Sequence, residues 1–415
     1  MLKTRLFSEY RMIYSITDDY PNTMRFIIEL KDNIKFSSLR FAINMIQKRY
    51  PYLCIELKKD DEGFYFIKND REIVLEKRGK GVLLNSLESN YHFMAFSYDD
   101  KHITYDMSHA IADGNTAYEV IRTLLYYYIS NAYQVNLSKE NIRLVEDDIS
   151  EEEYIDPLLK YKGVKTEKVV KEPALSLFGN DNSKEQKKTL WHLTIEEKEL
   201  LDIARPLKAS PGTLMLILLG KTINKLNKNS EYDIRLNLCY DLRKVLNAPL
   251  AHNSLVGSVL YTYNDDLSLE ESIKELRENI KRTIRPENAN KLLSNYIGVI
   301  TFLSELKDAN VIKQVVETMN QKTSSLITSG LSYVGKANFG DAEKYITDFV
   351  TIANARIGIL IELAAVNNKF YLDFIQNIEG EEYFNSFIQE LNNMNINYEI
   401  KEKTEVNPAK IKRVI

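Results

Sequence analysis

The stretch from His102 to Leu125 changes its hydrophobic period in mid-course, and this change constrains the fold of the chain most strongly. Ile103, Tyr105 and Met107 alternate with polar residues, which is the period of a half-buried strand. Helical spacing then runs from Thr116 to Leu125. The stretch therefore predicts a strand, a short loop and a helix, as in an α/β protein with mixed sheets flanked by helices.

The loop between the expected strand and helix carries one histidine, His109. Asp113 stands four residues later at the expected N-cap, and Gly114 lacks a Cβ, so a ligand can approach the backbone. A loop histidine oriented by a nearby carboxylate is a candidate general base. The alternative is a structural histidine, because the three fixed positions of this pattern arise by chance in about one chain in thirty.

The length of 415 residues exceeds that of one ordinary core and predicts two domains. Polar segments without a sustained period, near residues 145–153 and 179–185, indicate a crossover between two halves. We expect a first subdomain over residues 1–150, which carries the histidine, a linker over 151–187 and a second subdomain over 188–415.

Charge and composition exclude several classes of protein. The net charge of −4 gives no electrostatic case for nucleic-acid binding. The N-terminus lacks the apolar core of a signal peptide, and the longest apolar run, residues 214–220, is too short to span a bilayer. Cys54 and Cys239 show neither disulfide nor metal-ligand spacing. We therefore expect a cytoplasmic protein with free thiols, no transmembrane segment and no metal.

Local signals place helix starts and further candidate residues. Thr194 and Glu197 have the spacing of a capping box, and Ser210 precedes Pro211 as an N-cap precedes a first helical proline. Asp106 lies on the polar side of its strand, where exposure is expected. Apart from His109 and His252, the histidines are expected to be structural or exposed; they are His92, His102 and His192.

Four segments in order resemble one enzyme superfamily. Residues 108–114 (Ser-His-Ala-Ile-Ala-Asp-Gly) resemble the His-x-x-x-Asp-Gly active-site segment of chloramphenicol acetyltransferase, nonribosomal peptide condensation domains and polyketide-associated acyltransferases. Residues 240–244, with Asn253 and Gly257 after them, resemble the Asn-Leu-Arg segment of that group. Residues 332–335 resemble its Ser-Asn-x-Gly turn, and residues 357–392 its closing hairpin and helix. The resemblance is greatest to bacterial stand-alone alcohol-acetyltransferase-like proteins.

This resemblance implies two chloramphenicol-acetyltransferase-like subdomains with an active-site tunnel between them. It implies an acyltransferase that moves an acyl group from an acyl thioester, with acyl-CoA expected, to a small alcohol or amine. His109 would be the general base, and the Gly114 N–H a candidate donor to the oxyanion. Asp113 and Arg243 would form a structural ion pair. Coenzyme A thioester would be a co-substrate, no cofactor would be bound permanently, and a monomer is expected.

Some positions depart from the pattern of the superfamily. Ser108 replaces a second histidine, Tyr240 and Asp241 replace Val-Asn, and Tyr333 replaces an asparagine. Candidate tunnel-lining residues are Ser108, Tyr240, His252, Asn253 and Tyr333, although a structural role is the favoured interpretation of His252. Two alternatives remain: an acyltransferase with an acyl carrier protein as donor, and a non-catalytic condensation-like protein that binds a carrier or partner protein.

Overall fold

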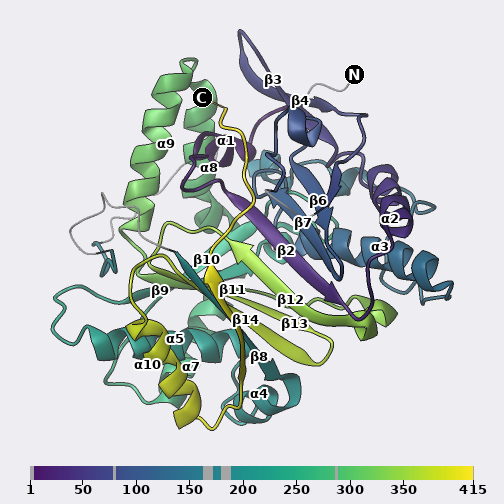
Figure 1. Ribbon diagram of the computed structural model, residues 1–415. Helices are drawn as coiled ribbons and strands as arrows, with labels where there is room; N and C mark the ends of the chain where they lie inside the picture. Colours follow the sequence, from purple (N-terminus) through teal and green to yellow (C-terminus); the bar gives the residue numbers. More distant parts are fainter. Residues whose placement is uncertain (1–3, 78–80, 162–171, 179–187, 286–287, 415) are drawn as a thin grey trace.

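The computed structural model describes residues 4–77, 81–161, 172–178, 188–285 and 288–414. These residues form two lobes, and each lobe is built on a β-sheet with helices packed against it (Figure 1). Two large buried clusters of apolar side chains fill the spaces between sheets and helices. The α/β class with mixed sheets and flanking helices is therefore confirmed.

The first lobe is built on a five-stranded mixed sheet. Its elements are α1 (Glu9–Tyr14), β2 (Thr23–Leu30), α2 (Phe36–Arg49), β5 (Leu75–Lys77), β6 (Met94–Tyr98), β7 (His102–Ser108), α3 (Gly114–Tyr133) and β12 (Ile346–Ala353). The strand order is β12–β2–β7–β6–β5, and only β5 and β6 are parallel neighbours. Alternate residues such as Phe26 and Tyr105 pack with the apolar faces of α2 and α3.

A small three-stranded sheet also forms in this half of the chain. It consists of β1 (Thr4–Arg5), β3 (Ile55–Asp60) and β4 (Gly63–Lys68), in the order β1–β4–β3.

The second lobe is built on a seven-stranded mixed sheet. Its elements are β8 (Thr189–Glu196), α4 (Glu197–Ala204), α5 (Pro211–Leu226), β9 (Arg235–Asp241), α6 (Arg243–Leu246), β10 (Val256–Thr262), α7 (Leu269–Thr283), α8 (Ala289–Glu305), α9 (Ala309–Ser324), β11 (Ser329–Lys336), β13 (Ile359–Val366), β14 (Lys369–Gln376), α10 (Glu382–Asn393) and β15 (Glu399–Glu405). The strand order is β10–β9–β11–β13–β14–β8–β15, and β11 runs parallel to both of its neighbours.

One strand of the second half belongs to the sheet of the first lobe. β12 lies within residues 188–415, yet it pairs along β2, with Phe349 opposite Ile28. Near the C-terminus, Ile411 also forms a bridge with Leu84 of the first half. The expected boundary at residue 188 therefore does not separate the two sheets, because one strand of the segment 188–415 belongs to the sheet of the first lobe.

The described parts of the expected linker pack against both lobes. Glu153 is buried and accepts hydrogen bonds from both terminal nitrogens of Arg49, at 2.9 and 3.0 Å. Leu158 joins a buried cluster with residues of α6 and α8. Residues 162–171 and 179–187 of this segment lie outside the described residues.

The helix-start signals have mixed outcomes. Ser210 caps α5 through the Thr213 N–H at 3.1 Å, with Pro211 in the first turn as expected. The capping box at Thr194 is wrong. β8 continues to Glu196 because its residues pair with β14 on one side and β15 on the other. Among the described residues, no helix combines the length and apolarity needed to cross a bilayer.

The expected exposure of Asp106 is also wrong. Its side chain is buried and accepts two hydrogen bonds from Arg25 of the adjacent strand β2, at 2.7 and 2.8 Å. The two residues lie opposite each other in the strand register, so the guanidinium neutralises the carboxylate at a position where both side chains are buried.

His192 predicts a dependence of stability on pH. It is buried on β8 with Nδ1 2.7 Å from Asp373 and Nε2 2.9 Å from Asp348. Burial alone would lower the pKa of His192, but the two carboxylates outweigh it and raise the pKa to about 10. Since the unfolded value is about 6.5, the charged form stabilises the fold fully below that pH. This contribution should decline as the pH rises toward 10.

Thermal unfolding of the wild type and His192→Gln over this pH range measures the effect. The wild type should lose more of its Tm than His192→Gln between neutral pH and pH 10. His102→Gln is the control, because that half-buried imidazole contacts the partly exposed carboxylate of Asp99 instead of two carboxylates around a buried ring. Equal loss of Tm in the wild type and His192→Gln would contradict the assignment.

Candidate active site

The loop after β7 holds His109 where the two lobes meet. β7 ends at Ser108, and the His109 backbone N–H donates to the carbonyl of Asn22 at 2.9 Å, which ties the loop to the start of β2. Asp113 caps α3 by accepting from the Thr116 N–H at 3.1 Å. The strand, loop and helix expected from the sequence are therefore confirmed, and they fix both ends of a short loop.

The imidazole of His109 is half-buried, with Nδ1 3.1 Å from the hydroxyl oxygen of Ser254. Burial lowers the pKa of His109, although its own backbone carbonyl and Asp113 favour the protonated form. The ring is therefore neutral at pH 7. In the tautomer whose Nδ1–H donates to Ser254, the lone pair is on Nε2, which has no hydrogen-bond partner among the described residues.

Asp113 and Arg243 are brought together as a buried pair. The Arg243 guanidinium donates to both carboxylate oxygens of Asp113, at 2.9 and 3.0 Å, and also to the Ala251 carbonyl at 2.7 Å. Asp113 further accepts from the Leu255 N–H at 2.9 Å. Burial opposes the charge of Asp113, but Arg243 and the backbone donors outweigh it and lower its pKa. The carboxylate joins α3 to the second lobe.

The start of α3 contacts the second lobe at two further points. Asn115 donates to the Asp241 carboxylate at 2.8 Å. A Cβ added at Gly114 would lie 3.0 Å from a methyl carbon of Val334, so a side chain at this position would press on β11. Gly114 therefore permits the close approach of the two lobes beside His109.

Tyr240 and Tyr333 both pack with the apolar core of the seven-stranded sheet. Tyr240 also packs against a second buried cluster, which contains Phe7 of the first half of the chain. The lining of a tunnel by these two residues stays a prediction. Tyr240 covers Gly257 of β10, where a Cβ would lie 2.5 Å from its ring, and Tyr333 covers Gly212 of α5. Side chains alternate along a strand, so the neighbours of these tyrosines point to the opposite face of the sheet.

The expected turn at residues 332–335 is a continuation of β11 to Lys336. The pairing with β13 shifts between Tyr333 and Lys336, and Gly335 has a φ of +105°, which favours glycine. The segment is therefore an irregular strand end.

His252 lies in a buried polar cluster instead of beside the His109 ring. Its Nδ1 is 2.5 Å from the hydroxyl of Tyr52 and its Nε2 is 3.0 Å from Glu119 of α3. Its ring also stacks on that of Tyr52. These contacts correspond to the structural interpretation. They anchor the loop that carries Ser254 two residues later.

The remaining candidate residues make backbone contacts. The Ser108 hydroxyl is buried and accepts from the Ala110 N–H at 3.3 Å, within the loop itself. The Asn253 carbonyl accepts from Arg243 at 3.2 Å, while its side-chain oxygen is buried without a partner among the described residues. Both residues shape the loops on either side of His109.

Neither cysteine is placed to act as a nucleophile. Burial raises the pKa of the Cys54 thiol to about 12, and likewise that of Cys239. A thiol with this pKa is not ionised at neutral pH, so it is a weak nucleophile.

A cavity of about 290 Å³ lies between the lobes on the side of Asn22, and we call it the interlobe cavity. Its walls come from α1 and the segment before β2, from β9, α8 and α9, and from the segment between β12 and β13. Asn22 lines it, and the carbonyl of Asn22 accepts from the His109 N–H. The interlobe cavity therefore lies next to the loop that holds the imidazole.

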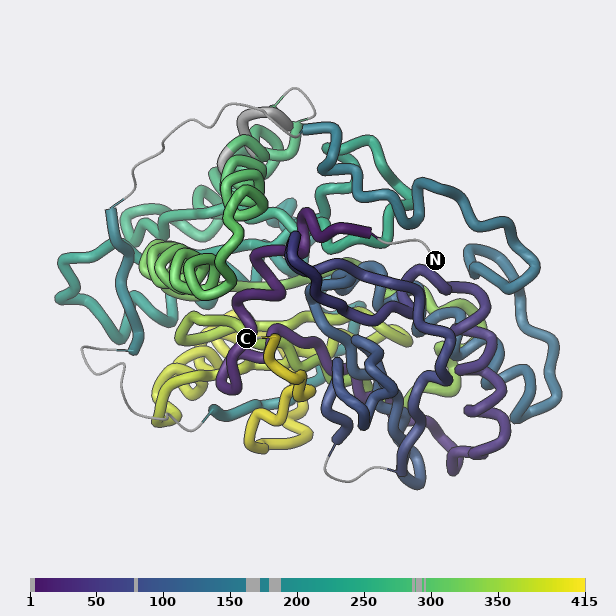
Figure 2. The backbone as a smooth tube through the Cα atoms, turned by 90° about the horizontal axis from the view of Figure 1, so that it is seen from above, coloured from purple at the N-terminus to yellow at the C-terminus, as the bar shows by residue number. Residues whose placement is uncertain are grey.

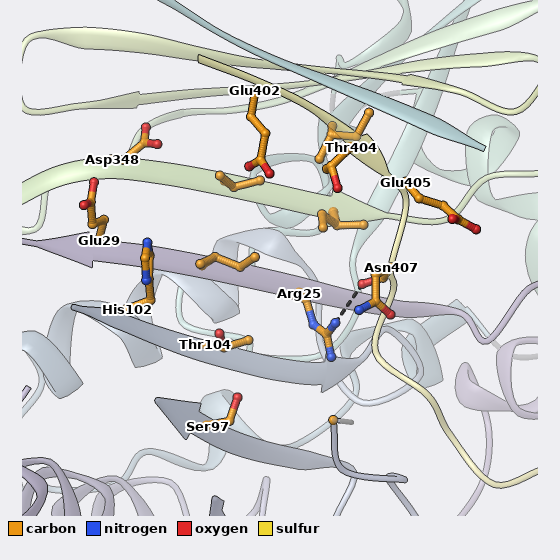
Figure 3. A pocket seen from close by; sticks show the side chains of 15 residues that line it. Arg25, Glu29, Ser97, His102, Thr104, Asp348, Glu402, Thr404, Glu405 and Asn407 are labelled. Atoms are coloured by element: carbon orange, nitrogen blue, oxygen red, sulfur yellow. Dashed lines mark hydrogen bonds between the residues drawn. The ribbon is translucent and has the colours of Figure 1, made fainter. Parts of the chain in front are cut away.

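A second cavity, of about 350 Å³, lies on the face of β2 and β7 opposite α2 and α3 (Figure 3). Arg25, His102 and Thr104 point into it from the first sheet, and Glu402 faces them from β15. His109 does not line this cavity, so its polar side chains are not placed to act in chemistry at the imidazole.

Sequence reasoning missed Ser254 and the arginines of the interlobe cavity, Arg11 and Arg356. Ser254 directly follows His252 and Asn253, which are candidate tunnel-lining residues. The sequence around Ser254 does not indicate a contact with a histidine 145 positions away. Arg11 and Arg356 come from segments that share no motif and meet only through the fold.

No family model and no curated protein matches the sequence. Solved structures do match over nearly the whole chain. Polyketide synthase associated protein 5 from Mycobacterium tuberculosis is 12% identical, with a TM-score of 0.62, covering 93% of this chain and 96% of that protein. The epimerization domain from the third module of tyrocidine synthetase B is 14% identical, with a TM-score of 0.59 and coverages of 95% and 96%.

A third match is the starter condensation domain of rhizomide synthetase, solved as a mutant in complex with C8-CoA and Leu-SNAC. It is 11% identical, with a TM-score of 0.60, covering 94% of this chain and 93% of that domain. These likenesses span both lobes at an identity too low to indicate a subfamily. The chain has the two-lobed fold of the chloramphenicol acetyltransferase and condensation-domain structures.

Proposed function

We propose that this protein transfers an acyl group from an acyl thioester, with coenzyme A as the thiol carrier, to an alcohol or amine. The observation that carries the proposal is the state of His109. Its imidazole is neutral at pH 7, is held through Nδ1 by Ser254, and keeps Nε2 without a partner among the described residues where the lobes meet. This is the arrangement that a general base requires.

The reaction can be written with these groups and with balanced protons. Nε2 of His109 accepts the proton of the acceptor hydroxyl or amine as its oxygen or nitrogen attacks the thioester carbonyl. The carbon–sulfur bond then breaks, and the departing thiolate takes the proton back from the imidazolium. The products are an ester or amide and a free thiol, and no acyl-enzyme is formed.

The oxyanion that forms between these two steps needs hydrogen-bond donors. The backbone N–H of Gly114 is one candidate, because the first N–H groups of a helix have no partner within that helix. The positive end of the α3 dipole favours negative charge at the same place. Ser254 is a positioning residue, since it acts on the substrate only through His109.

The comparisons support the class of donor. The rhizomide starter condensation domain has this fold, and its structure contains C8-CoA and Leu-SNAC, which are thioester compounds. The presence of His109, Asp113 and Arg243 in one arrangement favours an enzyme over a non-catalytic binding protein. A carrier-protein thioester is the alternative donor.

Release of free thiol from acyl-CoA tests the proposal directly. Acyl-CoAs of increasing chain length are supplied with panels of alcohols and amines, and thiol is detected colorimetrically. We expect thiol release that depends on the acceptor. Because burial lowers the pKa of His109, kcat/KM should fall only below a midpoint that lies under the usual 6.5. Absence of acceptor-dependent thiol release from acyl-CoA and from acyl carrier protein would overturn the proposal.

A further inference from the structure

Ser254, whose hydroxyl contacts His109, lies in a loop over residues 250–255 between α6 and β10. The loop contains neither a helix nor a strand, so its shape depends on bonds to other elements. The start of α3 supplies one of these bonds, because the Thr116 hydroxyl donates to the His252 carbonyl at 3.0 Å. The place of the Ser254 hydroxyl is therefore set in part by the first lobe.

The segment between α3 and β8, which we call the crossover segment, holds the same loop from another side. The Leu250 N–H donates to the Glu152 carboxylate at 2.8 Å, and the His252 N–H donates to the Glu153 carbonyl at 3.0 Å. Figure 2 shows the described part of this segment that follows α3 running along the outer edge of the molecule. Its described residues belong to neither sheet, yet they fix the backbone two residues before Ser254.

Side chains from four parts of the chain close a ring of polar contacts around this loop. We call it the polar ring, and its members are Tyr52, Glu119, Arg143, Glu153 and His252. The Tyr52 hydroxyl donates to Glu153 at 2.7 Å and lies 2.5 Å from Nδ1 of His252. Nε2 of His252 is 3.0 Å from Glu119 of α3. Arg143 completes the ring through ion pairs with both Glu119 and Glu153.

Both carboxylates of the polar ring are ionised at neutral pH. Burial opposes the charge of Glu119, but the hydrogen bond from His252 and the nearby arginines outweigh it and lower its pKa. Burial likewise opposes the charge of Glu153, and the hydrogen bonds from Arg49 and Tyr52 outweigh it and lower its pKa. An ionised carboxylate only accepts, so Nε2 of His252 carries a proton in its bond to Glu119. The imidazole is thus held at both nitrogens.

We propose that the polar ring positions the general base: Tyr52 and His252 hold the loop over residues 250–255 so that the Ser254 oxygen selects the Nδ1–H tautomer of His109. In the other tautomer Nε2 carries the hydrogen and cannot accept the proton of the acceptor. Tyr52 and His252 are positioning residues, because they act through Ser254. The effect on rate rests on the proposed acyl transfer, while the effect on the tautomer does not.

Tyr52→Phe tests the effect on rate. It removes the hydroxyl but keeps the ring, which stacks on that of His252 with centroids 5.6 Å apart. We expect kcat for thiol release to fall roughly tenfold or more with KM nearly unchanged, because the base is misoriented and no substrate contact is lost. Tyr133→Phe is the matched control, since that half-buried hydroxyl donates to the Asp32 carboxylate at 2.9 Å at the far end of α3. Equal kcat in the two variants would overturn the proposal.

A double-variant cycle separates positioning through Ser254 from a general structural role. Ser254→Ala removes the last contact between the loop and the His109 ring. Tyr52→Phe combined with Ser254→Ala should therefore be no slower than Ser254→Ala alone. Losses of kcat that multiply in the double variant would show that Tyr52 acts by another route and would overturn the proposal.

Nitrogen NMR of the histidine rings tests the proposal without turnover. In protein labelled with ¹⁵N-histidine, the His109 ring is identified by its absence in His109→Ala, and at neutral pH it should show a protonated Nδ1 and an unprotonated Nε2. Tyr52→Phe and Ser254→Ala should both move the two resonances toward those of the other tautomer. This change in a protein that releases no thiol would leave the positioning role standing and reject the acyl transfer. Unchanged His109 resonances in Tyr52→Phe would reject the positioning role.

Discussion

Replacing His109 by alanine is expected to lower kcat/KM for thiol release by about a hundredfold to ten-thousandfold, which is the usual contribution of a general base. The residue is half-buried at the end of β7, and the variant removes Nε2 while leaving the loop contacts to Asn22 in place. Tm should therefore change little. Initial rates of thiol release, measured with the acyl-CoA and acceptor found active for the wild type, give the ratio.

His102→Ala is the matched control for this variant. His102 is likewise half-buried, at the start of β7, but it faces the cavity of Figure 3 and contacts Asp99. Its replacement should leave kcat/KM near the wild-type value. Full activity of His109→Ala would show that another group takes the proton and would remove the general base from the mechanism.

Replacing Asp113 by asparagine is expected to destabilise the protein by about 3 kcal/mol, the lower end for a broken buried pair, because it removes the buried one of the two carboxylates that pair with Arg243. The exposed carboxylate of Asp241, 2.9 Å from the guanidinium, remains. Both side chains are buried and joined by two hydrogen bonds, so little solvent is available to compensate the guanidinium. Asparagine can still cap α3, and the loss therefore reports on the ion pair. Denaturant titration measures the change, and the rate of thiol release should fall with it.

Two further variants sharpen this measurement. Asp113→Asn combined with Arg243→Gln removes both charges, so it should be more stable than the sum of the two single variants predicts. Asp202→Asn removes the carboxylate of an exposed pair with Lys198 on α4, and the free energy of unfolding should barely change. A change for Asp113→Asn as small as that for Asp202→Asn would contradict a structural role for the pair.

The elements around the candidate site were predictable because their signals are local. The alternation before His109 and the cap at Asp113 each depend on neighbours within a few residues, and both are confirmed. Arg243 was identified only through the resemblance, since nothing near it in the sequence indicates a buried partner 130 positions earlier.

The sequence did not predict which face of a strand Tyr240 and Asp106 occupy, or which residue on the neighbouring strand lies opposite them. Tyr240 follows Leu236 and Leu238 at intervals of two residues, so the period of β9 already places it in the apolar core. Asp106 appeared exposed because the arginine opposite it lies 81 residues away, and register cannot be read from one strand.

The insertion of β12 into the first sheet has a consequence for how the lobes can move. β12 is hydrogen-bonded along β2, and the segment that follows it lines the interlobe cavity before β13 returns to the second sheet. The lobes cannot separate without breaking this row of bonds and exposing the open edge of β2. A relative motion of the lobes that keeps these bonds must therefore carry β12 with the first lobe and bend the chain in the segments on either side of it.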